Sequence, residues 1–153
     1  MVSEGVREAC ATDARRLAEI DALQNPGPWS ETLFRDSIAA GQCRLAVDAS
    51  GRICGFVVFQ TVLDECEILG IAVEPGQQRR GIGTRLLSAA LAEARAQGAR
   101  ACYLEVRVSN EAAQSLYLAH GFVPNGLRKA YYGAGAARED ALLLRLEMAA
   151  REP

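Results

Sequence analysis

The sequence is poor in lysine and histidine, and it contains no long hydrophobic run. Only Lys129 among the 17 basic residues is a lysine, and the 19 acidic residues bring the formal net charge to −2. A nucleic-acid-binding face is normally strongly basic, so this balance argues against nucleic acid as a partner. The longest uncharged apolar run, 53–63, is too short for a bilayer span of about 20 residues. We therefore expect neither a nucleic-acid partner nor a membrane protein.

Metal ligands are equally scarce. The five cysteines are widely spaced without a Cys-x-x-Cys pair, and His120 is the one histidine, so no familiar zinc spacing can be assembled. Scattered cysteines in odd number are typical of small buried hydrophobic residues in a reducing compartment. The N-terminus carries Glu4 and Arg7 before any apolar stretch, unlike a signal peptide. We expect a cytoplasmic protein without a bound metal.

The length of 153 residues predicts about one domain, which we place at 1–153. Apolar periodicity and turn residues predict helices and strands in a mixed order. The expected helices are 12–23, 30–40, 82–97 and 110–120, and the expected strands are 5–9, 44–47, 53–62, 65–73, 102–106, one opening at 122, and 138–146. This order indicates an α/β (α+β) domain in which helices flank one central, mostly antiparallel sheet.

Capping residues and apolar spacing define the expected helices more closely. Thr12 or Asp13 is expected to cap the first helix, and Ser30 the second. In the first helix Leu17, Ile20 and Leu23 are assigned to one apolar face. Gly98 is the expected C′ residue of the third helix. The apolar face of that third helix consists of Ile82, Leu86, Leu87, Ala90, Leu91 and Ala94.

The segment 78–84, between a strand and a helix, suits an anion. A helix N-terminus offers unpaired backbone N–H groups, and Gly81 and Gly83 carry no Cβ that would keep a phosphate away from them. It is no Walker A loop, because Ile82 stands where the lysine should be, and no dinucleotide fingerprint, because Leu86 replaces the third glycine. The alternative is a glycine-rich turn with two solvated arginines.

The wider pattern resembles the acetyl-CoA-binding core of the GNAT N-acetyltransferases. A strand (67–73), Pro75, the loop Gln78-Arg79-Arg80-Gly81-Ile82-Gly83 and an amphipathic helix follow one another as in that family. Further motifs look like its RimI branch: 28–30, 104–107, 109–113, 116–117, 121–122, 131–132 and 138–141. The resemblance covers about residues 4–147. It implies the GNAT fold, acetyl-CoA as co-substrate, and acetylation of the α-amine of an N-terminal alanine in a small-subunit ribosomal protein.

The resemblance also implies site residues. Glu105 and Tyr117 are the expected general base and general acid, and a backbone N–H near Ile71 to Val73 is expected to meet the oxyanion. The expected cofactor-binding residues are Ile71, Ala72, Val73, Gln78, Arg79, Arg80, Gly81, Ile82, Gly83, Thr84, Asn110 and Tyr117. The expected substrate-binding residues are Trp29, Glu67, Tyr131 and Tyr132.

The chemistry of acetyl transfer agrees with these roles. Strand alternation puts Tyr103, Glu105 and Arg107 on one face, although Glu105 could instead be a structural carboxylate paired with an arginine, and Glu67 is the rival base. An α-amine acceptor has a pKa of about 7.7–8.0, whereas a lysine acceptor has one near 10.4. Deprotonating the lysine would cost roughly 3.5 kcal/mol more, so an α-amine can be served by a weaker base. Tyr117 lies seven residues after Asn110 on the same helical face; its alternative role is a core aromatic.

Several functional alternatives stay open. The acceptor could be a small amine or a lysine side chain, and a non-catalytic acyl-CoA-binding module is a third possibility. For the chain itself we expect a monomer or a weak homodimer.

Overall fold

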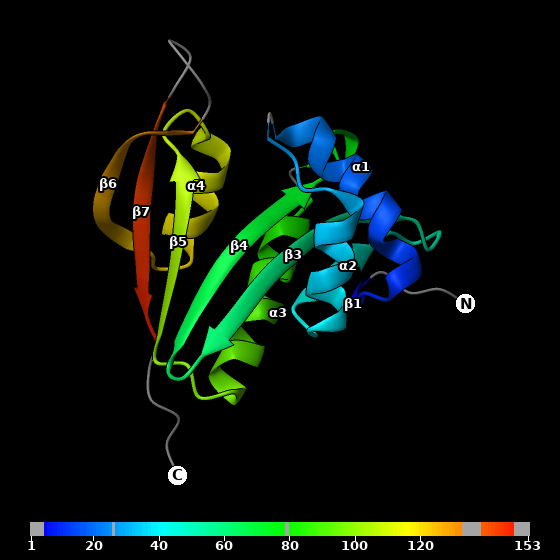
Figure 1. The fold of residues 1–153 in the computed structure, drawn as a ribbon, viewed down its shortest axis with the longest axis horizontal. Coiled ribbons are helices and arrows are strands. Elements are labelled where there is room, and N and C mark those ends of the chain that lie inside the picture. Colours follow the sequence, from blue (N-terminus) through cyan, green and yellow to red (C-terminus); the bar gives the residue numbers. More distant parts are fainter. Residues whose placement is uncertain (1–4, 26, 79, 133–138, 149–153) are drawn as a thin grey trace. The chain divides into compact units, whose positions relative to one another are not determined.

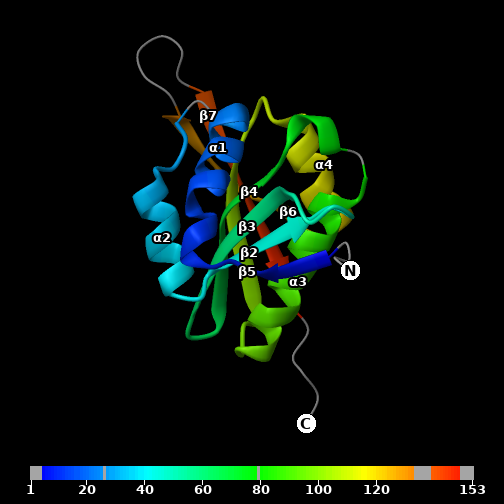
Figure 2. The ribbon, with the colours of Figure 1, turned by 90° about the vertical axis from the view of Figure 1, so that its right-hand side faces the viewer.

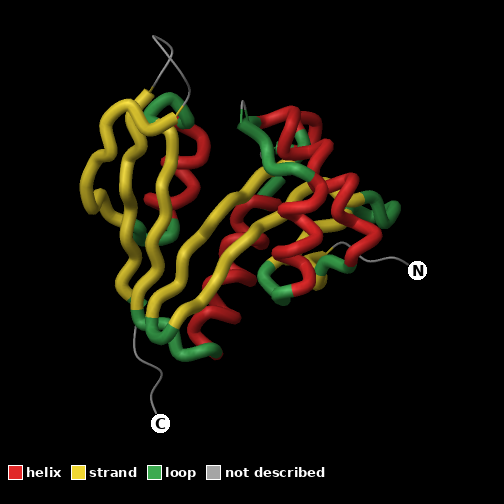
Figure 3. Tube along the Cα trace, in the orientation of Figure 1, coloured by secondary structure: helices red, strands yellow, loops and turns green. Residues whose placement is uncertain are grey.

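The computed structural model describes residues 5–25, 27–78, 80–132 and 139–148. The chain divides into two compact units, one made of 1–59 with 70–92 and the other of 60–69 with 93–153. Strand β3 (Ile53–Val62), strand β4 (Glu65–Val73) and helix α3 (Ile82–Ala96) each contribute residues to both units. Figure 1 labels the elements, and Figure 3 separates helices from strands by colour.

The described strands form one sheet with hydrogen-bonded neighbours in the order β1-β2-β3-β4-β5-β7-β6. The remaining strands are β1 (Gly5–Glu8), β2 (Cys43–Val47), β5 (Ala101–Arg107), β6 (Val123–Tyr132) and β7 (Glu139–Glu147). Pairing is antiparallel for β1/β2, β2/β3, β5/β7 and β6/β7, and parallel for β4/β5. The parallel ladder runs from Glu65 opposite Ala101 to Ile68 opposite Leu104, inside the second unit. The mixed, mostly antiparallel sheet is confirmed.

In the first unit, helices cover both faces of the sheet (Figure 2). Phe34 of α2 (Glu31–Ala39) meets the ring of Phe56 edge-on, with centroids 5.0 Å apart. The preceding residue, Gly55, faces α3, because a Cβ built there would lie 3.2 Å from Leu86 Cδ1 and 2.9 Å from the Ala72 carbonyl oxygen. Successive strand residues point to opposite faces, so α2 and α3 pack on opposite sides of β3.

The predicted apolar face of α3 is confirmed. Its six residues, from Ile82 to Ala94, are each no more than 4% exposed. Gly98, two residues after the helix, has a φ of +97°, as expected of a C′ glycine.

The first helix, α1 (Ala14–Gln24), follows its predicted pattern in part. Leu17 and Ile20 are buried, whereas Leu23 is 62% exposed, so its assignment to the apolar face was wrong. Leu23 follows Leu17 by six residues. At about 100° per residue this is a net rotation of about 240° around the helix axis, which turns Leu23 away from the buried face. Among the start signals, Ser30 caps α2 as predicted, since its Oγ accepts the Leu33 N–H at 3.1 Å.

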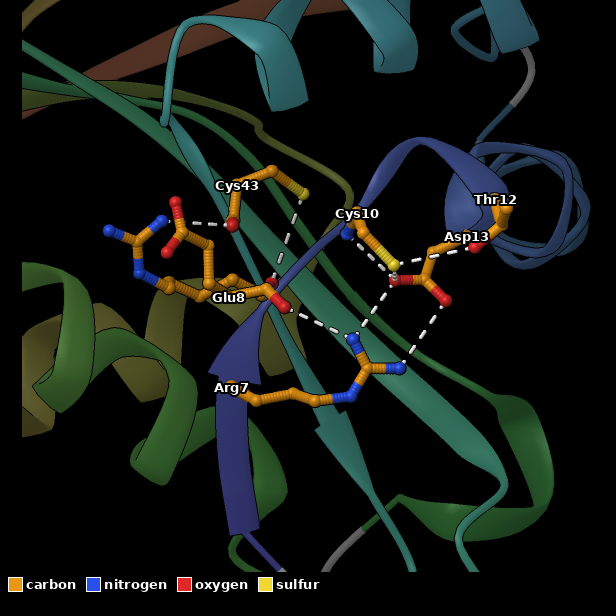
Figure 4. A network of polar contacts seen from close by, with 7 residues as sticks. Arg7, Glu8, Cys10, Thr12, Asp13 and Cys43 are labelled. Carbon is orange, nitrogen blue, oxygen red and sulfur yellow. Dashed lines mark hydrogen bonds and ion pairs between the residues drawn. The ribbon is translucent and has the colours of Figure 1, made fainter.

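Asp13 is the N-cap residue of α1, one of the two predicted, but its carboxylate makes no capping hydrogen bond and bonds backwards along the chain. A short 3-10 helix, η1 (Ala11–Asp13), precedes α1, and Asp13 Oδ2 accepts the Cys10 N–H at 2.8 Å. Arg7 of β1 donates to both oxygens, at 2.9 and 3.3 Å (Figure 4). Burial alone would raise the pKa of Asp13, but hydrogen bonds from Arg7 and Cys10 outweigh it and hold the pKa below its ordinary value.

Four cysteines are buried, as predicted. Cys43, Cys54, Cys66 and Cys102 are each at most 1% exposed, and all five cysteines are free thiols. Cys10 differs, because it is exposed at the start of η1, where its Sγ lies 3.2 Å from Asp13 Oδ2. The prediction that every cysteine is a buried small residue was therefore wrong for Cys10.

In the second unit, β5 positions the side chains of interest. Its burial alternates, with Cys102, Leu104 and Val106 buried and the residues between them half-buried. Helix α4 (Glu111–Ala119) packs through Tyr117, whose ring centroid lies 5.7 Å from that of Phe122. The Gln114 side chain donates to the carbonyl oxygens of Arg107 and Val108, at 3.1 and 2.9 Å, and so fixes the connection from β5 to α4.

Candidate active site

The predicted anion loop does lead into a helix N-terminus. After the 3-10 helix η2 (Pro75–Gln77), the chain reaches Gly81, whose carbonyl oxygen accepts the Arg85 N–H at 3.0 Å. This bond is the first of the α3 ladder, so Gly81 is the N-cap. The N–H groups of Ile82, Gly83 and Thr84 consequently have no acceptor within the helix. They provide hydrogen-bond donors for an anion at the positive end of the helix dipole.

The conformation of Gly81 explains why glycine stands there. Its φ is +76°, a region that L side chains rarely adopt, while a Cβ at this position would meet open space. Within the protein the constraint on this position is therefore its backbone conformation, not a lack of space for a side chain. Beside it, Ile82 is buried and anchors the helix, and Arg80 and Thr84 are exposed. Arg79 lies outside the described residues.

A partly buried carboxylate, which sequence reasoning missed, holds the start of this loop. Glu74, the residue after β4, pairs through Oε2 with Arg16 of α1 at 2.8 Å and through Oε1 with Arg52 at 2.7 Å. Its N–H donates to the Cys54 carbonyl oxygen at 2.8 Å. The partners are 58 and 22 residues away in sequence, so no local spacing could have indicated them. Glu74 joins α1 and β3 to the point where the loop begins.

Gln78 extends the same region. Its side-chain amide lies 3.3 Å from Gln24 Oε1 and 3.5 Å from the Val73 carbonyl oxygen. The loop is therefore tied to the end of α1 and to the end of β4.

The residues expected to supply an oxyanion donor lie on the first-unit part of β4. Ile71, Ala72 and Val73 follow Ile68, the last residue of the parallel ladder with β5. Ala72 is buried, and the two residues beside it are half-buried. Their role toward an acetyl group stays a prediction.

Trp29 lies directly before α2 and is half-buried. The Trp29 ring is tilted against Phe34, with centroids 5.5 Å apart, and the Trp29 backbone N–H donates to Asp21 Oδ2 at 2.8 Å. One part of the indole is therefore packed and the rest reaches solvent, as a wall of a binding surface would require.

The second unit contains Glu105 on the half-buried face of β5. The predicted alternation is confirmed, because Tyr103, Glu105 and Arg107 all lie on this face. Each has a polar partner: Tyr103 Oη accepts from Arg145 Nε at 3.2 Å, and Arg107 pairs with Glu139 at 3.1 Å. Arg128 of β6 pairs with Glu105 Oε1 at 2.7 Å. The arginine partner left open for Glu105 is thus present.

Glu67, the rival base, is exposed on β4. It stands opposite Tyr103 in the parallel ladder, so paired positions place both on the same face of the sheet. Tyr131 and Tyr132 belong to β6, with Tyr132 opposite Glu139, and the prediction for their side chains lies outside what the structure describes.

Tyr117 and Asn110 occupy α4 as predicted, the first within the helix and the second at its start. Tyr117 is 5% exposed, and Asn110 is the exposed N-cap, whose Oδ1 accepts the Ala113 N–H at 3.2 Å. The capping bond uses the amide oxygen of Asn110 and leaves the roles of both residues toward a ligand as predictions.

Two features are absent from the residues that the structure describes. Among them, no helix is long and apolar enough to cross a membrane. The same part of the chain contains no group of three or more His, Cys, Asp or Glu side chains arranged to hold a metal ion.

Comparison with known proteins fits this architecture. The sequence profile of the Acetyltransferase (GNAT) family matches residues 14–122. The [ribosomal protein bS18]-alanine N-acetyltransferase of Salmonella typhimurium is 36% identical over 135 residues, which cover 88% of this chain and 91% of that protein.

Solved structures agree. The ribosomal-protein-S18-alanine N-acetyltransferase of Escherichia coli superposes with a TM-score of 0.84 at 31% identity, covering 97% of this chain and 96% of that one. Ard1 from Thermoplasma volcanium superposes with a TM-score of 0.87 at 25% identity, covering 97% and 99%. The chain therefore belongs to the GNAT acetyltransferase family and is an acetyltransferase of its RimI-like branch.

Proposed function

We propose that this protein transfers the acetyl group of acetyl-CoA to the N-terminal α-amine of a ribosomal protein that begins with alanine. In this proposal Glu105 is the general base and Tyr117 the general acid. The observation that carries it is the 36% identity, over 88% of the chain, to an enzyme named for alanine acetylation of ribosomal protein bS18. Such a target assigns the enzyme to the cytoplasm.

The α3 N-terminus supports acetyl-CoA as the co-substrate. The N–H groups of Ile82, Gly83 and Thr84 suit the oxygens of a diphosphate, and the exposed Arg80 adds a positive charge next to them. Acetyl-CoA supplies an acetyl group activated as a thioester. This chain supplies the anion-binding amides and a loop that Glu74 holds in place.

The environment of Glu105 supports its role as base. Its side chain is 29% exposed, so solvent and an incoming amine can reach it, and Arg128 fixes one of its oxygens at 2.7 Å. The second oxygen can take a proton, directly or through a water. An α-amine with a pKa of about 7.7–8.0 is partly neutral at pH 7, so a carboxylate suffices as its base.

Tyr117 supports the second proton transfer. A phenol with a pKa of about 10 is protonated at neutral pH and can donate to a thiolate whose conjugate acid lies near 8.5. The burial of Tyr117 and its ring contact with Phe122 restrict its orientation, which a positioned acid requires.

The test is a competition between acceptors. Purified enzyme with acetyl-CoA receives one of three acceptors: an alanine-starting bS18 peptide, the same peptide with a blocked N-terminus and an internal lysine, or a set of small amines. Mass spectrometry locates the acetyl group. We expect the free alanine peptide to react fastest; preference for the blocked peptide or a small amine would refute the assigned acceptor.

A pair of variants tests the base. Glu105→Gln should lower kcat by about 10²-fold or more, the usual scale for a lost general base. Glu67→Gln serves as the comparison, because Glu67 lies on the same face of the sheet. A large loss in Glu67→Gln with full activity in Glu105→Gln would transfer the role to Glu67.

A further inference from the structure

A buried carboxylate of the first unit has no place in the chemistry described so far. Asp21, in the second half of α1, is 7% exposed. Its Oδ2 accepts the Trp29 N–H at 2.8 Å, and the Asn25 side chain also hydrogen-bonds to it. Burial raises the pKa of Asp21 above its ordinary value, and these two hydrogen bonds offset that effect only in part.

The bonds of Asp21 act on the segment that joins α1 to α2. The Asp21 carbonyl oxygen accepts the Asn25 N–H at 2.9 Å, and Asn25 Oδ1 accepts the Gly27 N–H at 3.4 Å. Two of these bonds, from Asn25 and from Trp29, tie the segment to Asp21 of α1, and the bond from Gly27 to Asn25 holds the segment between them. The backbone entering α2 is therefore fixed by Asp21 from one side.

The ring of Trp29 is fixed from the other side. It packs on Phe34, which is fully buried and meets Phe56 of β3 edge-on. Trp29 is thus the outer end of an aromatic row that begins in the sheet. Two contacts restrict Trp29: the Phe34 ring packs against its indole, and the Asp21 carboxylate holds its backbone N–H.

A carboxylate is a costly choice for this position. Burying a polar group costs free energy unless its hydrogen bonds are made, and a buried charge costs more than a neutral group. Because the pKa is raised, the folded environment disfavours the ionised form of Asp21. Asp21 is bonded to Trp29, a residue expected to bind the acceptor. A carboxylate whose ionised form is disfavoured in the fold is more readily explained there by a role in positioning Trp29 than by a contribution to stability.

We propose that Asp21 is a positioning residue, which holds Trp29 in the orientation that receives the acceptor peptide. This inference rests on the proposed function, in which Trp29 forms a wall for the acceptor. Asp21 itself does not touch the substrate. Its loss should weaken acceptor binding and leave acetyl-CoA binding unchanged, because the α3 N-terminus is built by other residues.

The first measurement needs no substrate. Trp29 is the one tryptophan of the chain, so its fluorescence reports on this residue alone. Asp21→Ala should increase acrylamide quenching of Trp29 and shift its emission to the red, since the backbone anchor is lost. Asp21→Asn keeps an oxygen that can accept the Trp29 N–H and should resemble the wild type. Asp21→Ser is a second variant that keeps a polar side chain. Its hydroxyl is too short to reach that N–H, so it should behave as the alanine variant does.

Asp13→Asn is the matched control. Asp13 is also a buried aspartate of the first unit, 8% exposed, and its carboxylate accepts hydrogen bonds from Arg7 and Cys10 (Figure 4). The Asp13→Asn variant should have a lower thermal stability than the wild type, with unchanged quenching of Trp29 and an unchanged KM for the acceptor peptide. A merely structural role of Asp21 would make its variants behave like Asp13→Asn.

The kinetic result completes the test. Asp21→Ala should raise the acceptor KM about tenfold, the scale of one lost hydrogen bond to a charged group, with the KM for acetyl-CoA within about twofold of the wild type. Unchanged quenching and an unchanged acceptor KM in both Asp21→Ala and Asp21→Ser would overturn the inference. If the wild type acetylates no N-terminal peptide, the proposed function fails, and quenching alone then decides whether Asp21 positions Trp29.

Discussion

Replacing Glu74 with glutamine removes two ion pairs that share one carboxylate, those with Arg16 and Arg52. The Glu74 side chain is 16% exposed, Arg16 is 25% exposed and Arg52 is 58% exposed. The pair with Arg16 is the better shielded, so we assign it about 1.5–3 kcal/mol, the range for hydrogen bonds to charged groups. The exposed pair with Arg52 should contribute about 0.2–1 kcal/mol. Arg16 keeps its bond to the Ile53 carbonyl oxygen at 3.2 Å, which places the total loss near the lower end, at about 2 kcal/mol.

Urea unfolding at two salt concentrations measures both terms. Double-mutant cycles with Arg16→Gln and Arg52→Gln should give the larger coupling energy for Arg16, and high salt should reduce the Arg52 coupling more strongly. Glu31→Gln is the matched control, because its pair with Arg35 is exposed on one helix and should contribute about 0.3–0.5 kcal/mol. Equal couplings for the two arginines, or a Glu74→Gln loss no larger than that of Glu31→Gln, would refute the reasoning from exposure.

Three further predictions follow from single features of the structure. Gly81→Ala should cost about 1–2 kcal/mol of stability through its positive φ and weaken acetyl-CoA binding in calorimetry, while full affinity would contradict the anion loop. Tyr117→Phe should lower kcat far more than acetyl-CoA affinity, and an unchanged kcat would exclude Tyr117 as the acid. The pKa of Asp13 is lowered and that of Asp21 is raised, so their asparagine variants should respond oppositely to pH in urea unfolding. Asp13 stabilises the fold above its unfolded pKa of about 3.8, and the deficit of Asp13→Asn should disappear as pH falls through the lower folded value. The ionised form of Asp21 is the disfavoured one, so Asp21→Asn should gain relative to the wild type as pH rises above 3.8; parallel pH responses of the two variants would contradict these signs.

Local patterns predicted the parts of the fold that depend on neighbouring residues. The six buried residues of α3, the Ser30 cap, the positive φ of Gly98 and the alternation around Glu105 each follow from helical or strand periodicity within a few residues. The same reasoning failed for Leu23, where an apolar residue was assigned to a face that it is rotated away from.

Contacts between distant segments could not be predicted in this way. The pairs of Glu74 with Arg16 and Arg52, and of Arg128 with Glu105, join residues 58, 22 and 23 positions apart. Asp21 looks like an ordinary solvated residue of an amphipathic helix, and its burial depends on how the following segment folds back over it. Such residues are determined by tertiary packing, which one sequence does not reveal.

The exposure of Cys10 limits how this protein can cross-link. The other four thiols are buried. Each native molecule therefore offers a single sulfur that a maleimide can alkylate or that air oxidation can convert to a disulfide. A molecule with one reactive group can join one other and then stops, so ageing without reductant should yield covalent pairs and no longer polymers. Bands beyond the pair on a non-reducing gel would consequently report unfolding of the core.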